Sequence, residues 1–98
     1  MTAYVLAQIS IHDRERYQRY VAGFAPILQK YEGRLLAADE APTVLEGRSD
    51  REKVVLMSFP DAEAARRFHE SPDYRRIAVD RNAGADAVVL LVKGFAAK

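Results

Sequence analysis

Arg81 is the residue of this sequence whose type and spacing most strongly suggest chemistry. It follows a tyrosine and two apolar residues at i, i+3, i+4, i+7 spacing, namely Tyr74, Ile77 and Ala78. A helix over this stretch carries the arginine along its apolar face, where an unpaired charge is expensive. One interpretation is a clamp for a carboxylate or enolate oxygen. The other is a structural ion pair, either with Glu46 or across a dimer interface.

The sequence has two histidines, and His69 is the better candidate for chemistry. Next to Phe68 on the inward side of a helix, it suits a general base near neutral pH or a ligand of haem iron. No orienting carboxylate is visible in the sequence, so a structural or solvent-facing histidine is the alternative. His12 is at a strand–helix junction, which is more typical of a surface residue. Two distant histidines without HxxxH spacing predict no metal site, and we predict no cofactor, with haem as the remaining alternative.

The other candidate site residues are two tyrosines, a phenylalanine and a glutamate. Tyr20 and Tyr74 lie on apolar helix faces, where each either serves the core or donates a hydroxyl proton into a pocket. Glu46 precedes Gly47 at the end of an apolar segment and is either solvated or held ionised by Arg81. We therefore predict a pocket between sheet and helices for a small, partly apolar, anionic or enolisable compound. Its predicted ligand-binding residues are Tyr20, Phe24, Glu46 and Tyr74, and its predicted catalytic residues are His69 and Arg81.

Seven or eight short elements must position these side chains. Alternating apolar residues predict strands over 3–11, 34–38 with a continuation over 43–46, 53–59 and 87–92. Helical periodicity predicts a helix after an Asp13 cap, a second over 62–70 after Asp61, and a third over 72–82 after Ser71. The order is β-α-β-β-α-β, with both later helices in one crossover. This order predicts one α+β domain over 1–98, a ferredoxin-like fold with a four-stranded antiparallel sheet.

Two prolines and a glycine set the expected irregularities. Pro26 interrupts the first helix, but the apolar stripe continues past it, so we expect a kink rather than an end. Gly33 is predicted to close that helix in the left-handed conformation. Pro42 lies in the break 39–42, which suggests a bulge or an edge strand. A polar hairpin loop is expected over 47–51.

The strands 53–59 and 87–92 are apolar on both faces, which means that both faces are covered. The helices can cover one face of the sheet only. The simplest cover for the other is a second copy packed sheet to sheet with twofold symmetry. A different partner protein is the alternative.

Composition excludes several classes of function. The chain has 98 residues, 30% of them charged with a net charge of +1, and no cysteine. Disulfide frameworks, thiolate nucleophiles and cysteine metal sites are therefore excluded. Acidic and basic residues are interleaved without a basic block, so we reject nucleic acid as the main partner. No apolar run is long enough for a membrane span, and a cytoplasmic location is expected.

Several short motifs together resemble one family along nearly the whole chain. They are Val44-Leu45-Glu46-Gly47, Phe59-Pro60, Ala64-Ala65, Ser71-Pro72-Asp73-Tyr74 and Arg81. In this order they resemble the family called domain of unknown function 1330, within the dimeric α/β-barrel superfamily. The chain departs from that family at Ser58, where a carboxylate is common, and at Phe68-His69, where Trp-Tyr is common.

The resemblance implies a ferredoxin-like dimer and leaves the reaction open. Related superfamily members include cofactor-independent monooxygenases, small isomerases and haem-degrading enzymes. Two functions therefore stand at this point. One is a pocket that binds a small organic compound, with or without acting on it. The other is a non-catalytic dimeric module in which Arg81 forms a structural ion pair.

Overall fold

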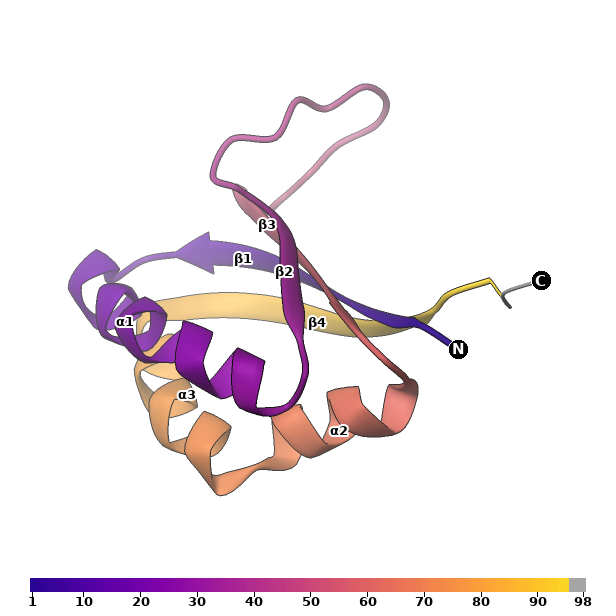
Figure 1. Cartoon of the computed structure of the whole chain (residues 1–98). Coiled ribbons are helices and arrows are strands. Elements are labelled where there is room, and N and C mark those ends of the chain that lie inside the picture. Colours follow the sequence, from indigo (N-terminus) through magenta and orange to yellow (C-terminus); the bar gives the residue numbers. More distant parts are fainter. Residues whose placement is uncertain (96–98) are drawn as a thin grey trace.

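The computed structural model describes residues 1–95 as a sheet with three helices on one of its faces (Figure 1). The short tail expected over 94–98 falls mostly outside the described residues. The strands and helices, in chain order, are β1 (Ala3–Ile11), α1 (Arg14–Lys30), β2 (Arg34–Asp39), β3 (Lys53–Phe59), α2 (Ala62–Glu70), α3 (Pro72–Gly84) and β4 (Ala85–Lys93). The predicted ferredoxin-like α+β order is confirmed, with α2 and α3 sharing the second crossover.

The four strands form one antiparallel sheet in the order β2-β3-β1-β4. The first and last strands of the chain pair along their full length, with Ala3 opposite Lys93 and Ile11 opposite Ala85. On the other side of β1, Val5 lies opposite Met57. Because side chains alternate along a strand, this register puts the odd-numbered residues of β1, β3 and β4 on the helix side.

Helix α1 begins where the sequence predicts. The Asp13 side chain accepts a hydrogen bond from the Arg16 amide at 3.2 Å and so caps the first turn. The helix continues through Pro26 to Lys30, as the apolar stripe indicates. Its buried residues are Tyr17, Tyr20 and Leu28, on the side that faces the sheet and α3.

The predicted left-handed cap at Gly33 is wrong. The residue with a positive φ is Glu32, at 64°. Gly33 is favoured for a different reason, because an added Cβ would clash with the Leu28 side chain and lie 2.8 Å from Phe59 Cε1. The glycine allows the chain to pass close against the core as it enters β2.

The predicted continuation of the second strand over 43–46 is also wrong. Strand β2 ends at Asp39, and residues 40–52 form an irregular segment that we call the β2–β3 arm. Its ends are held by an ion pair between Arg14 and Glu40 (3.0 Å) and by the Glu52 carboxylate, which accepts from the Ile11 amide at 2.9 Å. Figure 1 shows the arm extending beyond the sheet, away from the helices. Strand β2 does lie at the edge of the sheet, and it carries a bulge between Leu35 and Ala37.

Ser71 joins α2 to α3 and fixes the side chains on both sides of it. Its buried hydroxyl donates to the Phe68 carbonyl at 2.8 Å and accepts from the Tyr74 amide at 3.1 Å. Pro72 is the first residue of α3, where a missing amide hydrogen costs nothing. The predicted second helix start is confirmed, and it holds Phe68 and Tyr74 next to each other.

The two faces of the sheet have different surroundings. The covered face, under the helices, buries Val5, Ala7, Val55, Met57 and Phe59. The opposite face, which we call the open face, has nothing over it within residues 1–95. On this face Val88, Leu90 and Val92 are 36%, 45% and 44% exposed. The sequence pattern of two apolar faces is therefore real, and one chain covers only one of them.

Candidate functional site

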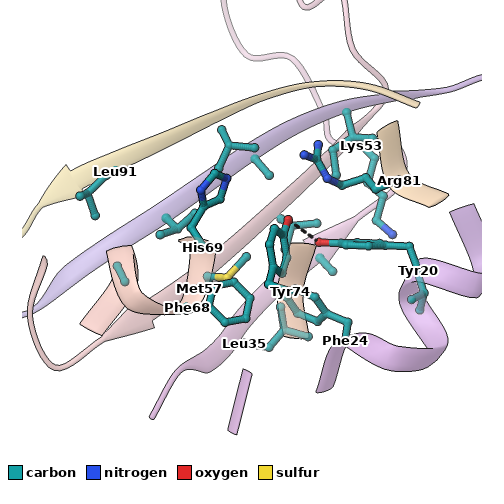
Figure 2. Close-up of a pocket in the computed structure, with 18 of the residues that line it drawn as sticks. Tyr20, Phe24, Leu35, Lys53, Met57, Phe68, His69, Tyr74, Arg81 and Leu91 are labelled. Carbon is teal, nitrogen blue, oxygen red and sulfur yellow. Dashed lines mark hydrogen bonds between the residues drawn. The ribbon is translucent and has the colours of Figure 1, made fainter. Parts of the chain in front are cut away.

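A cavity of about 290 Å³ lies between the covered face and the helices (Figure 2). Its floor comes from β1 and β3, through residues such as Ala7, Val55 and Met57. Its walls come from α1, α2 and α3, and it reaches the edge strands at Leu35 and Leu91. The cavity is thus the space that the three helices leave unfilled over the centre of the sheet.

Aromatic rings make up most of the wall on the helix side. Phe68 packs against Tyr74 with ring centroids 4.7 Å apart, and it meets the Phe24 ring edge-on at 5.9 Å. Phe24 in turn lies 5.6 Å from Tyr20. These contacts hold the rings in fixed orientations, so the wall is rigid and suits an apolar or aromatic group.

Two buried tyrosines place their hydroxyl groups together at the cavity wall. Tyr20 comes from α1 and Tyr74 from the first turn of α3, and their oxygens are 3.0 Å apart. The side chains are only 7% and 5% exposed. One hydroxyl must donate to the other, and the accepting hydroxyl keeps a proton free for a further acceptor. Figure 2 shows this pair pointing into the cavity.

The surroundings of Tyr20 keep its phenol neutral. Burial, and after it the neighbouring Tyr74 hydroxyl, raises the pKa of Tyr20 well above its ordinary value. The positive charge of Arg81 opposes this shift without cancelling it. At physiological pH Tyr20 is therefore a neutral phenol and not a phenolate.

Arg81 extends from α3 toward the same tyrosines. Its guanidinium carbon lies 5.9 Å from the centre of the Tyr20 ring, as expected of a cation–π contact. Its Nε atom is buried and has no hydrogen-bond partner within residues 1–95. The predicted apolar stripe of α3 is confirmed, since Tyr74 and Ala78 are buried and Arg81 follows one turn later. A buried N–H without an acceptor is costly, which makes Arg81 the group in this cavity that most needs a partner.

Glu46 does not supply that partner. It lies in the exposed β2–β3 arm and does not line the cavity. The proposed intrachain ion pair between Glu46 and Arg81 is absent from the described residues, because the strand that was expected to carry Glu46 toward the sheet does not form. The other five predicted site residues, Tyr20, Phe24, His69, Tyr74 and Arg81, all line the cavity.

His69 comes from the last turn of α2 and lines the cavity, and Figure 2 shows its ring between Leu91 and Tyr74. Its ring centroid is 5.4 Å from that of Tyr74, although the side chain as a whole is exposed. An exposed imidazole beside a cavity can exchange protons with both solvent and a bound molecule. His12 is remote from the cavity, at the junction of β1 and α1, where its amide donates to the Gly84 carbonyl at 2.9 Å.

Lys53 is a cavity residue that the sequence reasoning missed. It is the first residue of β3, and its ammonium nitrogen lies 4.8 Å from the centre of the Tyr17 ring. A signal was present in the sequence. Lys53 is in phase with Val55, Met57 and Phe59, the core side of the strand, where a charged residue is unusual.

The charged residues that line the cavity are mostly basic. Lys53, Arg66 and Arg81 line it, and Glu70 is the one acidic lining residue in the described part of the chain. Within residues 1–95, no group of three or more histidine, aspartate or glutamate side chains is placed to hold a metal ion. The electrostatics of the cavity therefore favour a negatively charged organic ligand.

Membrane insertion through a helix has no support in the described residues. None of the three helices is both long and apolar enough to cross a bilayer. The cytoplasmic location inferred from the sequence stays a prediction.

A comparison with known protein families identifies the family of this chain. The family model described as domain of unknown function (DUF1330) matches residues 2–95. The chain belongs to this family. The resemblance drawn from Ser71-Pro72-Asp73-Tyr74 and the other short motifs is thereby confirmed. No curated protein sequence matches the chain significantly.

Solved structures with the same fold share little sequence with this DUF1330 protein. RPA0582 of Rhodopseudomonas palustris, a protein of unknown function, is 17% identical with a TM-score of 0.81, over 98% of this chain and 84% of that one. SnoaB of Streptomyces nogalater, a cofactor-independent oxygenase, is 15% identical with a TM-score of 0.66, over 98% and 95%. A dimeric ferredoxin-like protein of unknown function from Jannaschia sp. CCS1 is 17% identical with a TM-score of 0.67, over 96% and 100%. At these identities the comparisons establish the fold.

Proposed function

We propose that this DUF1330 protein binds a small, partly apolar organic anion in the cavity, with Arg81 holding its carboxylate or enolate oxygen. The observation that carries the proposal is the buried Nε–H of Arg81, which has no acceptor among residues 1–95. A guanidinium donates through a planar fork that matches a carboxylate, so one ligand group satisfies both the charge and the orphan donor. The aromatic wall around Phe24 and Phe68 accommodates the apolar part.

The tyrosine pair adds a neutral donor next to that charge. The oxygens of Tyr20 and Tyr74 are 3.0 Å apart, and one proton of the pair remains for the ligand. Such a donor stabilises an oxyanion without carrying charge itself. This is why an enolisable compound, whose oxygen becomes negative when a carbon-bound proton leaves, belongs to the proposed ligand class.

The proposal extends to catalysis by proton transfer. His69 takes the proton from carbon, while Arg81 and the tyrosine pair hold the enolate oxygen that results. Return of a proton at another carbon is isomerisation, and reaction of the enolate with dioxygen is the route of a cofactor-independent oxygenase. SnoaB, which has the same fold, is an oxygenase of that kind. This likeness in fold, together with the cavity residues, supports the extension.

We also propose that the protein is a homodimer whose copies pack through their open faces. The exposed Val88, Leu90 and Val92 support this arrangement, since an apolar face of this kind is unusual on a stable monomer. The Jannaschia protein is described as dimeric, and so is a ferredoxin-like protein of unknown function from Bacteroides fragilis NCTC 9343. The cavity lies on the other side of the sheet, so each copy keeps its own.

A thermal-shift screen with Arg81→Met tests the binding proposal. Small aromatic acids and keto acids are expected to raise the melting temperature of the wild type and to leave that of Arg81→Met unchanged. Without ligand, the variant should melt close to the wild type, because methionine removes a donor that has no partner. Arg75→Met, an exposed position on the same helix, is the matched control and should respond like the wild type.

The rival function makes the opposite prediction. If Arg81 forms a structural ion pair across the dimer, Arg81→Met destabilises the protein strongly with no acid present. Equal thermal shifts in the wild type and in Arg81→Met would also contradict the binding proposal. In the first case the protein is better described as a non-catalytic dimeric module, and in the second Arg81 does not hold the ligand.

A further inference from the structure

Lys53 brings a second cation to the cavity from a different element than Arg81. It begins β3, where it pairs with Ile9 of β1, and it points to the covered face. Its ammonium lies against Tyr17, whose buried ring adjoins that of Tyr20 with centroids 5.7 Å apart. Arg81 lies against Tyr20. The two cations thus contact neighbouring rings on one side of α1, and Figure 2 shows them at the same end of the cavity.

No acidic side chain neutralises this end of the cavity within the described residues. The chain pairs many of its other basic residues with carboxylates: Arg14, Arg16, Arg19, Lys30 and Arg67. Neither Lys53 nor Arg81 has such a partner in residues 1–95. Glu70, the acid that lines the cavity, comes from α2 with Arg66 one turn before it. Two unpaired cations beside a buried tyrosine pair are therefore the distinctive feature of this end.

We propose that Lys53 is the second anchor of the ligand and that the ligand is an aryl-substituted α-keto acid or its enol. This inference rests on the proposed function. The fork of Arg81 takes the carboxylate, and Lys53, a point charge with three donors, takes the keto or enolate oxygen on the adjacent carbon. A simple carboxylic acid would satisfy Arg81 and leave Lys53 with only its contact to Tyr17.

The apolar part of the cavity indicates which substituent the proposed keto acid carries. Phe24 and Phe68 meet edge-on and line the cavity together with Met57, so this part of the cavity suits an aromatic ring. A cavity volume of about 290 Å³ accommodates one aromatic ring with a short acidic side chain. The proposed class therefore has one aryl group, one carboxylate and one keto oxygen.

Two probes that differ only in the keto oxygen test the role of Lys53. Phenylpyruvate carries that oxygen and hydrocinnamate has a methylene group in its place. By isothermal titration calorimetry at fixed ionic strength, the wild type is expected to bind phenylpyruvate about tenfold more tightly. Lys53→Met should lose this preference while its affinity for hydrocinnamate changes by less than about twofold. Arg81→Met should weaken both probes by about tenfold or more.

Further variants separate a specific contact from general attraction or misfolding. Lys93→Met removes an exposed lysine that does not line the cavity and should leave both affinities unchanged. Lys53→Gln keeps a polar side chain at the start of β3, and it replaces Lys53→Met if circular dichroism shows that the latter is unfolded.

Two results overturn the inference in distinguishable ways. If the Lys53 variants weaken both probes equally, the keto oxygen has no contact with Lys53, and the proposed function stands without it. If the wild type binds neither probe, or if Arg81→Met binds both as well as the wild type, the proposed function fails and the inference fails with it.

Discussion

The covered and open faces of the sheet are both apolar, but they differ in the type and packing of their side chains. The open face presents aliphatic side chains from adjacent strands, such as Leu6, Leu56 and Leu90, which lie side by side in the register. The covered face combines small aliphatic residues with the aromatic rings of the helices and keeps a cavity among them. Leu6, Leu56 and Leu90 form a continuous apolar surface, which suits packing against a similar surface.

The two faces also differ in their polar groups. The buried donors that lack a protein acceptor include Arg81 Nε, on the covered side, and the tyrosine pair lies beside it. At the open face, polar residues such as Gln8 and Ser58 are only half-buried and can reach water in a single copy. The proposed function accordingly assigns recognition of a small molecule to the covered face and assembly to the open face.

The largest expected effect comes from a charge on the open face. Leu90→Glu puts a carboxylate at the centre of the proposed interface in both copies, where loss of hydration costs several kcal/mol. We expect a folded monomer by analytical ultracentrifugation at micromolar concentration, with helix content unchanged by circular dichroism.

Val79→Glu is the matched control for that change. Val79 is a similarly exposed apolar residue, but it lies on α3 and away from the sheet. This variant should remain dimeric. A wild type that sediments as a monomer would contradict the dimer proposal. A Leu90→Glu variant that stays dimeric would show that the interface is not on the open face.

The second prediction tests whether the cavity on the covered face catalyses proton transfer. In deuterated water, the protein is expected to speed deuterium exchange at the carbon next to the keto group of phenylpyruvate. His69→Ala should slow the catalysed exchange by about a hundredfold, the lower range for loss of a general base. Proton nuclear magnetic resonance measures the exchange directly.

His12→Ala is the control in that experiment, because His12 lies outside the cavity. It should exchange at the wild-type rate. If the wild type is no faster than buffer, or if His69→Ala matches it, then His69 is not a proton shuttle and the cavity only binds.

The smallest effect concerns the pH dependence of stability. The pKa of Tyr20 is raised in the folded state, chiefly by burial, whereas in the unfolded chain it stays near 10. Above pH 10 the unfolded chain therefore releases a proton that the folded protein keeps, and the free energy of unfolding falls as pH rises. Tyr20→Phe should lose about 1 kcal/mol at pH 7 through the missing hydrogen bond, and its stability should fall less steeply above pH 10.

Urea unfolding of the two proteins between pH 7 and the alkaline range measures this difference. Parallel declines above pH 10 would show that Tyr20 ionises as readily when folded as when unfolded. The raised pKa of the buried Tyr20 phenol would then be wrong.

Local signals in the sequence predicted most of the fold. The alternation over β3 and the caps at Asp13, Asp61 and Ser71 located their elements correctly. Each of these depends on neighbours within a few residues, so it can be read without knowing the fold. The strand wrongly predicted over 43–46 has the opposite origin. An apolar run such as Val44-Leu45 forms a strand only where another strand is available to pair with it, and none reaches the β2–β3 arm.

The candidate site was predicted in part for the same reason. Helical spacing placed Tyr20, Phe24, Tyr74 and Arg81 on inward faces, and the structure brings all four to one cavity. Glu46 was expected there because a strand was expected. Lys53 was overlooked because the alternation of its strand was counted for apolar residues only.

The sequence by itself determined which residues are helical or extended and which side of each element turns inward, because these follow from backbone geometry and the period of apolar side chains. It also determined that the sheet has two apolar faces. Only the tertiary structure decided that the Tyr20 and Tyr74 hydroxyls meet, that Arg81 and Lys53 share one end of a cavity, and that no carboxylate from residues 1–95 reaches them. The first two relations join residues 54 and 28 positions apart in the sequence, and they depend on how α1 and α3 pack against each other over the sheet.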